Sequence, residues 1–376
     1  MSNHSFNRRE MLKIGAMASA TAFLNFGSGG GGTANAQNSA VPQPIIRLSG
    51  NENPYGPSPK ARQAIVEAAA SGNRYAGVEA AQLEKMIAER ENVAPESIVL
   101  GTGSGEVLAM AAVAYGLEKS EMVAADNTFM WLLQYAERIG ARVNRVPLDA
   151  DYAHDLDAMS RRVSPATKLV YVCNPNNPTG TIVSTPKLKQ FCEEVSGKTT
   201  ILIDEAYLEY TDDFPANSMI DFVRKGANVI VLRTFSKIYG LAGMRVGYGI
   251  AKPEIAARLR RFRMTWLNPV SLRAAIASLQ DADFVKESRR KNTEVQIFTR
   301  RELDRMNLKY VPSPANSIWL NVGAGNRDLP QKLAKFKIQI RGGGNLPLDS
   351  DWARISIGTM AEMKIFTDAL RQTLRS

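Results

Sequence analysis

"VIVLRTFSKIYGLAGMRVGYG", residues 229–249, joins the pattern of a buried strand to a lysine and a glycine-rich loop. Its first four residues are apolar without interruption, which is typical of a parallel strand covered on both faces. Lys237 follows shortly after this run, and Arg245 comes later in the same loop. Ligands of open α/β sheets bind at the carboxyl ends of the strands, so the stretch predicts a ligand beside Lys237.

Similar apolar runs occur upstream and alternate with helix-forming segments. They include SIVL at 97–100, KLVYVC at 168–173 and TTILI at 199–203. This alternation predicts an α/β fold with a mostly parallel sheet flanked by helices on both faces. After about residue 267 the pattern changes, because a long helical stretch at 271–306 leads into short strand-like segments. We therefore expect a smaller C-terminal α+β domain.

The composition narrows the class of protein. The chain has 376 residues, of which 44% are hydrophobic and 22% charged, which is typical of a globular protein with more than one domain. With two histidines and two cysteines, a His/Cys metal site is not expected, and a Ser-His-Asp triad would need His154. We expect Cys173 and Cys192 to be small core residues, with a disulfide as the alternative in an exported protein.

The net charge of +10 would attract anionic ligands. The densest basic run, RLRRFR at 258–263, lies in a helix-forming segment beside Leu259 and Phe262. No nucleic-acid-binding module of basic and aromatic residues accompanies it, so nucleic acid is not an expected partner. We interpret the run as a solvated face or a subunit contact.

The N-terminal segment has the layout of a signal peptide. Arg8 and Arg9 precede an apolar, alanine-rich run at 14–26, and a glycine-rich stretch then leads to an A-x-A site at Ala34 and Ala36. The paired arginines indicate the twin-arginine kind, which would export the protein to the periplasm. The alternative is a basic tail on a cytoplasmic protein. Past this segment, no apolar run is long enough to span a bilayer.

Four predicted strand ends carry polar groups. The first is the glycine-rich turn at 101–105, which would present backbone N–H groups to an anion at the start of a helix. The second is NPNNPTG at 174–180, and the third is Asp204 with Tyr207. The fourth is Ser236 with Lys237. Parallel strands end at one edge of a sheet, so these groups would meet.

The combination matches the requirements of pyridoxal phosphate. The Lys237 amine would form a Schiff base with the aldehyde, and Asp204 would hold the pyridine nitrogen protonated. A tyrosine and an asparagine can hydrogen-bond the ring hydroxyl. Phe129 is placed to stack on the ring, and Arg245 is available to neutralise the phosphate. The sequence therefore predicts this cofactor and no metal.

The motifs NPNNPTG, DEAY and TFSKIYGLAGMRVGYG resemble those of class I/II pyridoxal-phosphate aminotransferases of fold type I. The similarity is greatest to the histidinol-phosphate aminotransferase branch. LSGNENPYGPSP at 48–59 is similar to the N-terminal signature of that branch, and GTGSGEVL at 101–108 is similar to its phosphate loop. The likeness extends from about residue 48 to the C-terminus.

The resemblance implies a role for each matching position. Lys237 is the Schiff-base lysine, Asp204 pairs with the pyridine nitrogen, and Tyr207 contacts the ring hydroxyl together with Asn177. The phosphate is held by residues of three segments: Gly103, Ser104, Gly105, Ser236 and Arg245. Tyr75 reaches the phosphate of the other subunit in a homodimer. The substrate is bound by Arg354, with three further residues nearby: Tyr55, Asn316 and Arg341.

The resemblance also implies a division of the chain. Residues 1–36 are the signal peptide, and 37–73 form an N-terminal segment packed on the small domain. Residues 74–267 are the large cofactor-binding domain, and 268–376 are the small C-terminal domain. The chain departs from the family around the phosphate loop and substrate entrance, where Gly105 replaces an acidic residue and Asn127 and Ala76 replace prolines.

The predicted function is transfer of an amino group between an amine and an oxo acid through Lys237. The amine is an amino acid or a relative such as histidinol phosphate or an aromatic amino acid. One alternative is a decarboxylase or lyase of the same fold, because the same electron sink serves both reactions. Another is an exported binding protein without turnover. A nicotinamide dehydrogenase is disfavoured, because GTGSGE lacks the third glycine of a dinucleotide loop.

Overall fold

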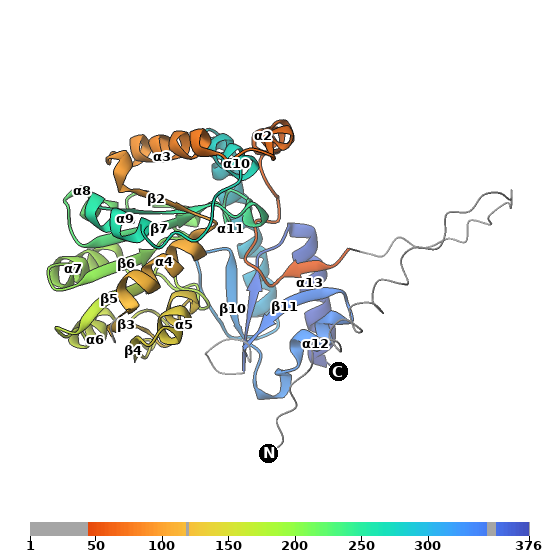
Figure 1. The fold of residues 1–376 in the computed structure, drawn as a ribbon. Coiled ribbons are helices and arrows are strands. Elements are labelled where there is room, and N and C mark those ends of the chain that lie inside the picture. The colour runs from red at the N-terminus through yellow and green to blue at the C-terminus, as the bar shows by residue number, and fades with distance from the viewer. Residues whose placement is uncertain (1–43, 118–119, 344–350, 376) are drawn as a thin grey trace, which may run out of the picture. The chain divides into compact units, whose positions relative to one another are not determined.

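The computed structural model describes residues 44–117, 120–343 and 351–375, and the compact unit comprises Pro44–Ser376. The predicted signal peptide lies outside the described residues. Two sheets organise this unit, as Figure 1 shows.

The larger sheet has seven strands in the order β2-β8-β7-β6-β5-β3-β4. Strand β8 is antiparallel to both neighbours, whereas the pairings from β7 to β4 are all parallel. The predicted mostly parallel sheet is therefore confirmed. The strands are β2 (Ile98–Gly101), β3 (Glu121–Ala125), β4 (Arg142–Val146), β5 (Thr167–Cys173), β6 (Thr200–Asp204), β7 (Val229–Thr234) and β8 (Gly247–Ala251).

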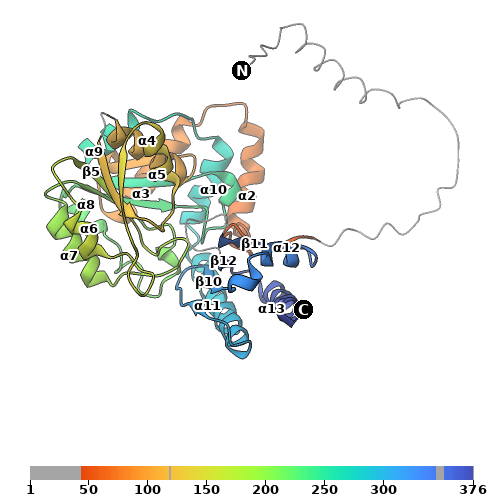
Figure 2. The ribbon, with the colours of Figure 1, turned by 90° about the horizontal axis from the view of Figure 1, so that it is seen from below.

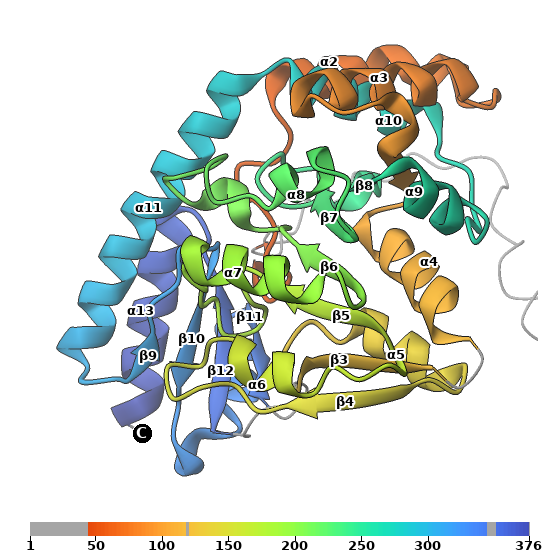
Figure 3. The same cartoon turned by 90° about the vertical axis from the view of Figure 1, so that its left-hand side faces the viewer.

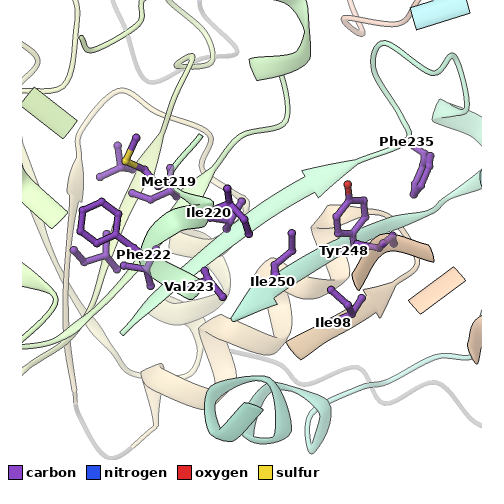
Figure 4. Packing of buried hydrophobic residues seen from close by; sticks show 14 of the residues in the cluster. Ile98, Met219, Ile220, Phe222, Val223, Phe235, Tyr248 and Ile250 are labelled. Atoms are coloured by element: carbon purple, nitrogen blue, oxygen red, sulfur yellow. The ribbon is translucent and has the colours of Figure 1, made fainter. Parts of the chain in front are cut away.

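Helices cover both faces of this sheet. Alternate residues of β7 enter two separate apolar clusters: Val229 and Val231 belong to one, Ile230 and Leu232 to the other. The first cluster includes residues of α3 (Gly77–Glu91), α6 (Leu156–Arg161), α7 (Thr185–Val195), α8 (Ile220–Arg224) and α10 (Pro269–Leu279). The second includes residues of α4 (Ser104–Gly116), α5 (Trp131–Arg138) and α9 (Pro253–Arg260). Figure 4 shows part of the first cluster, where Ile98 and Ile250 pair across β2 and β8. Burial on both faces explains why the strands are uninterrupted apolar runs.

The smaller sheet has five strands in the order β1-β11-β12-β10-β9. The strands are β1 (Ile46–Leu48), β9 (Tyr310–Val311), β10 (Ser317–Asn321), β11 (Ile338–Gly342) and β12 (Trp352–Ser356). A third apolar cluster packs one face of this sheet against α11 (Ala282–Arg305), α12 (Leu329–Ala334) and α13 (Met360–Arg375). Figure 2 shows these helices beside the small sheet, and Figure 3 shows α11 leading away from α10.

The segment before the large sheet contacts both parts of the unit. Strand β1 pairs in parallel with β11 of the small sheet, whereas α2 (Pro59–Ala68) packs against α10. Helix α2 begins at Pro59, where the Ser58 side chain accepts a hydrogen bond from the Ala61 amide and a proline suits the first turn. The domain boundaries drawn from the sequence remain a prediction.

The histidine and both cysteines of the described residues are buried. Cys173 and Cys192 are free thiols, and they belong to the apolar clusters on opposite faces of the sheet. His154 Nε2 lies 2.9 Å from the Cys173 carbonyl oxygen. Because a carbonyl oxygen can only accept, this nitrogen carries the proton. Burial lowers the pKa of His154 to about 4. A neutral, enclosed imidazole of this kind does not serve a Ser-His-Asp triad.

The basic run at 258–263 anchors chain segments as well as facing solvent. Arg258 donates to the carbonyl of Ala114 at 2.5 Å, and Arg260 donates to the carbonyl of Ile98 at 2.9 Å. Part of the run predicted to be a solvated face therefore joins α9 to the end of α4 and to β2 by hydrogen bonds.

Strand β7 also carries a buried cation where the sequence suggests only an apolar strand. Arg233 of β7 has a side chain that is 1% exposed. It donates to Glu91 at 2.6 Å, to Glu205 at 3.1 Å and to the Ser218 hydroxyl at 2.8 Å. These bonds connect β7 to α3 and to the end of β6, one residue after Asp204.

Replacing Arg233 by alanine should lower the free energy of unfolding by about 3–5 kcal/mol, because Glu91 and Glu205 would stay buried without their cation. Denaturant unfolding measures this loss. The matched control is Arg290→Ala, which removes an exposed arginine paired with Glu287 and Glu294 and should leave the free energy of unfolding nearly unchanged. Equal losses in the two variants would contradict the importance of the buried network.

Candidate active site

The predicted functional residues follow the carboxyl ends of three adjacent parallel strands. Asp204 is the last residue of β6, Lys237 follows β7, and Asn177 lies in the loop after β5. Strands β5, β6 and β7 are neighbours in the sheet, so these ends lie along one edge. Figure 3 shows the three strands side by side.

Lys237 lies in the loop that follows β7. Its Nζ donates to the carbonyl of Gly50 at 3.2 Å and lies 5.4 Å from the centre of the Tyr207 ring. The pKa of Lys237 is lowered to about 8, chiefly by burial and also by the positive charges of Arg354 and Arg245, whereas the charges of Glu52 and Asp204 act to raise it. The amine is therefore much more readily neutral, and hence nucleophilic, than an ordinary lysine.

Asp204 is buried, with 3% of its surface exposed. Its Oδ1 accepts a hydrogen bond from the Ala206 amide at 3.1 Å, and its Oδ2 accepts one from the Tyr171 hydroxyl at 3.0 Å. Burial raises the pKa of Asp204 to about 6, although these hydrogen bonds and the charge of Lys237 act in the opposite direction. The carboxylate is thus ionised at neutral pH and available to a cationic ring nitrogen.

A hydrogen-bonded group connects Tyr207 with the small sheet. The Tyr207 hydroxyl accepts from Asn177 Nδ2 at 3.3 Å and from Asn51 Nδ2 at 3.2 Å. Arg354 of β12 donates to Asn177 Oδ1 at 2.6 Å. Burial raises the pKa of Tyr207 to about 12, so the phenol keeps its proton. A neutral phenol beside an amide can hydrogen-bond the oxygen of a ring hydroxyl.

The turn before α4 forms a cup for an anion. Gly103 has φ 81°, and no side chain caps the helix that begins at Ser104. A Cβ at Gly103 would collide with the Arg245 guanidinium, and one at Gly247 would collide with the Ser104 backbone. Arg245 in turn lies 3.4 Å from the Ser236 hydroxyl. Glycine therefore allows backbone, hydroxyl and guanidinium groups to converge, which is the donor set of a phosphate site.

Glu106 holds this cup in place, a role that the sequence analysis missed. Its carboxylate accepts from the Thr102 amide at 2.6 Å, from the Met264 amide at 3.1 Å and from the Thr265 amide at 3.0 Å. Although burial acts to raise the pKa of Glu106, these hydrogen bonds outweigh it and lower the pKa. The phosphate cup is thereby tied to a segment more than 150 residues away in sequence.

The two arginines predicted to bind the substrate lie on paired strands of the small sheet. Arg341 of β11 and Arg354 of β12 are direct partners in the antiparallel ladder, so their side chains share a face. Arg354 also donates to the Ser49 carbonyl at 2.6 Å, and its buried Nε has no hydrogen-bond partner among the residues that the structure describes. Burial lowers the pKa of Arg354, and the charge of Arg341 acts in the same direction.

The remaining predicted residues differ in how closely they contact the groups described above. Asn316 donates to the Asn51 carbonyl at 2.9 Å, and the half-buried Tyr55 ring lies 4.6 Å from Lys291 Nζ. Phe129 is partly buried in the loop after β3 and packs against the second apolar cluster. Tyr75 is 89% exposed and contacts Trp266 rather than the site of its own chain. Its predicted role across a dimer interface remains a prediction.

The side chains present fit pyridoxal phosphate. A buried carboxylate, an amine of lowered pKa and an uncapped helix start with an arginine match its ring nitrogen, its aldehyde and its phosphate. Among the described residues, no group of three His, Cys, Asp or Glu side chains could hold a metal ion.

Comparisons with known proteins agree with this geometry. The family model for aminotransferase class I and II matches residues 43–370. The histidinol-phosphate aminotransferase of Moorella thermoacetica is 40% identical over 88% of this chain and 86% of its own length. That of Akkermansia muciniphila is 38% identical over 89% of this chain and 91% of its own. The solved structure of the Sinorhizobium meliloti histidinol-phosphate aminotransferase with pyridoxal-5'-phosphate has a TM-score of 0.79 and 28% identity, covering 88% of this chain and 92% of that one.

The lowered pKa of Lys237 predicts how fast the chain captures its cofactor at different pH values. Only the neutral amine attacks an aldehyde, so the rate of covalent attachment should rise about tenfold per pH unit below about pH 8 and level off above it. Stopped-flow absorbance on cofactor-free protein measures this rate, with Lys237→Ala as the control that shows no attachment. A rate that keeps rising beyond pH 10 would indicate an ordinary lysine.

Proposed function

The chain belongs to the class I and II aminotransferases, and we propose that its amino donor carries a phosphate or carboxylate group that binds Arg354 and Arg341. The protein is a pyridoxal-phosphate-dependent aminotransferase, as its relatives over most of the chain are. Those relatives favour amino transfer over the decarboxylase or lyase alternative and over a binding protein without turnover.

The opposed pair of arginines is the observation that carries this proposal. Two guanidinium groups on one face of a sheet repel each other, and within residues 44–117, 120–343 and 351–375 neither forms an ion pair with a carboxylate. Arginine binds phosphate and carboxylate through paired N–H donors, so an acidic substrate group would relieve both the repulsion and the unpaired Nε of Arg354. Histidinol phosphate, the donor named for the relatives, has such a group.

We infer a division of labour around the bound cofactor. Pyridoxal phosphate supplies an electron sink that stabilises negative charge at the substrate α-carbon. Ser104, Gly105, Ser236 and Arg245 would hold its phosphate, Asp204 its ring nitrogen, and Tyr207 with Asn177 its ring hydroxyl. Lys237 Nζ, whose pKa is lowered to about 8, takes the proton from the substrate α-carbon in its neutral form. Holding this amine next to the α-carbon makes the proton transfer effectively intramolecular.

Replacing Arg341 by glutamine should raise KM for histidinol phosphate by at least about tenfold and leave kcat nearly unchanged, because the arginine binds ground state and transition state alike. The control Lys332→Gln removes a positive charge from α12 of the same part of the molecule and should leave KM unchanged. Histidinol, which lacks the phosphate, should be a poor donor for the unmodified chain and insensitive to Arg341→Gln. Equal use of histidinol and histidinol phosphate would refute the proposed acid site. A panel of glutamate and aromatic amino acids would then identify the donor.

We propose that a second copy of the chain covers the exposed aromatic surface around Tyr75. Tyr75 and Trp266 are 89% and 79% exposed, with ring centres 6.2 Å apart, and Met264 beside them is 76% exposed. Glu106 ties the segment of Met264 to the phosphate cup, which places this surface next to the cofactor site. In the homodimer, Tyr75 would contribute to the phosphate site of the partner.

Mixed dimers test this arrangement. Tyr75→Ala should weaken cofactor binding in the homodimer, and Lys237→Ala should abolish transamination. A heterodimer of the two variants would contain one site with Lys237 from one subunit and Tyr75 from the other. The heterodimer should therefore have about half of the activity of the unmodified dimer, and its complete site should bind the cofactor with the original affinity. A mixture with no more activity than its parents, despite measured subunit exchange, would refute a contribution across the interface.

We propose that the chain is exported through a twin-arginine signal, as the order of residues in 1–36 suggests. In the part of the chain that the structure describes, no helix is long and apolar enough to cross a bilayer. Replacing Arg8 and Arg9 together by lysine should retain the protein in the cytoplasm, as fractionation and immunoblotting would show. An identical distribution for the unmodified and doubly substituted chains would instead indicate a basic tail on a cytoplasmic enzyme.

A further inference from the structure

Tyr171 reaches the site from the interior of the large sheet. It lies in the middle of β5 and is fully buried, yet its hydroxyl donates to Asp204 Oδ2 at 3.0 Å. In the ladder between β5 and β6, Tyr171 is paired with Leu202 and Cys173 with Asp204. Residues two apart on a strand point to the same face, so the Tyr171 ring and the Asp204 carboxylate share one side of the sheet.

The hydrogen bond has a fixed direction. Burial raises the pKa of the Tyr171 hydroxyl, and the charge of Asp204 raises it further, so the phenol keeps its proton and remains a donor. Asp204 therefore has one fixed donor at each carboxylate oxygen: the Ala206 amide at Oδ1 and Tyr171 at Oδ2. Two donors on different atoms fix the plane of the carboxylate, which one donor would leave free to rotate.

Other titratable groups also face Asp204. Lys237 contributes a positive charge that favours the carboxylate, whereas Glu205 contributes a negative charge that disfavours it. Tyr207 and Cys173 complete the surroundings, and burial raises the pKa of both, so each stays neutral. Among these groups, only Tyr171 donates a hydrogen bond to Oδ2, and it does so from a fully buried position in the sheet.

We propose that Tyr171 is a positioning residue whose hydroxyl keeps the Asp204 carboxylate ionised and oriented toward the ring nitrogen of the cofactor. This inference rests on the proposed assignment of Asp204 to that nitrogen. Burial raises the pKa of Asp204 to about 6, close to neutral pH, and the hydrogen bond from Tyr171 acts to lower it. Without that bond, a larger share of Asp204 would be protonated at pH 7. A protonated Asp204 would no longer balance a cationic ring nitrogen.

Tyr171→Phe tests the proposal, because it removes one oxygen and leaves the ring in the core. In the full-length chain purified without cofactor, the Asp204 titration midpoint should rise by about one to two pH units, the worth of a hydrogen bond to a charged group. Infrared difference spectra of the carboxyl stretch follow this titration, and the band missing in Asp204→Asn assigns it. The dissociation constant for pyridoxal phosphate at pH 7 should rise several-fold in parallel and recover at pH 9.

Tyr115→Phe is the matched control. Tyr115 is a second buried tyrosine of the same apolar cluster, and its hydroxyl accepts from Thr200 rather than contacting Asp204. The Tyr115→Phe variant should leave the titration midpoint of Asp204 and the cofactor affinity unchanged, whatever it does to thermal stability. An unchanged midpoint in Tyr171→Phe, or an equal shift in Tyr115→Phe, would overturn the proposal. If Asp204→Asn binds the cofactor as tightly as the unmodified chain at every pH, the assignment of Asp204 fails instead.

Discussion

The parallel register of β5, β6 and β7 is the constraint on which the site depends. Because these strands end together, the chain places Asp204 and Lys237 at one edge of a sheet that is buried on both faces. Burial there disfavours charge, which raises the pKa of the carboxylate and lowers the pKa of the amine until both lie within about two units of neutrality. The enclosure that stabilises the fold is thus also what prepares both groups for chemistry.

Buried polar groups behind this edge keep it rigid. Arg233 lies on β7 only four residues before Lys237 and is fixed by Glu205, the residue after Asp204. The same arginine reaches Glu91 of α3, so the two functional strands and a covering helix share one ion network. On the opposite face of the sheet, Tyr171 reaches Asp204 itself. Buried polar contacts therefore fix the end of β6, which carries Asp204, and the end of β7, which precedes Lys237, as preorganised sites require.

The small sheet completes the site from the other side. One face packs on α11, α12 and α13, and the other presents Arg354, which bonds both the Asn177 loop and the Ser49 carbonyl. The proposed cofactor residues come from the large sheet, while the proposed substrate cations come from the small one. The two parts are not independent, because the charge of Arg354 also lowers the pKa of Lys237.

The sequence by itself determined the mostly parallel sheet, the aminotransferase family and its pyridoxal phosphate cofactor, and it singled out Asp204, Tyr207 and Lys237 as candidate site residues. These follow from local patterns: apolar runs, glycine turns and motifs contained within a few residues. It did not reveal Tyr171, Glu106, Arg233 or Asn51, which read as ordinary strand, helix or loop positions. Their partners lie far away in the chain, 305 residues in the case of Asn51 and Ser356. Only the tertiary structure decided these contacts, because strand register and domain packing set which distant side chains meet, and desolvation at that meeting point sets their charge.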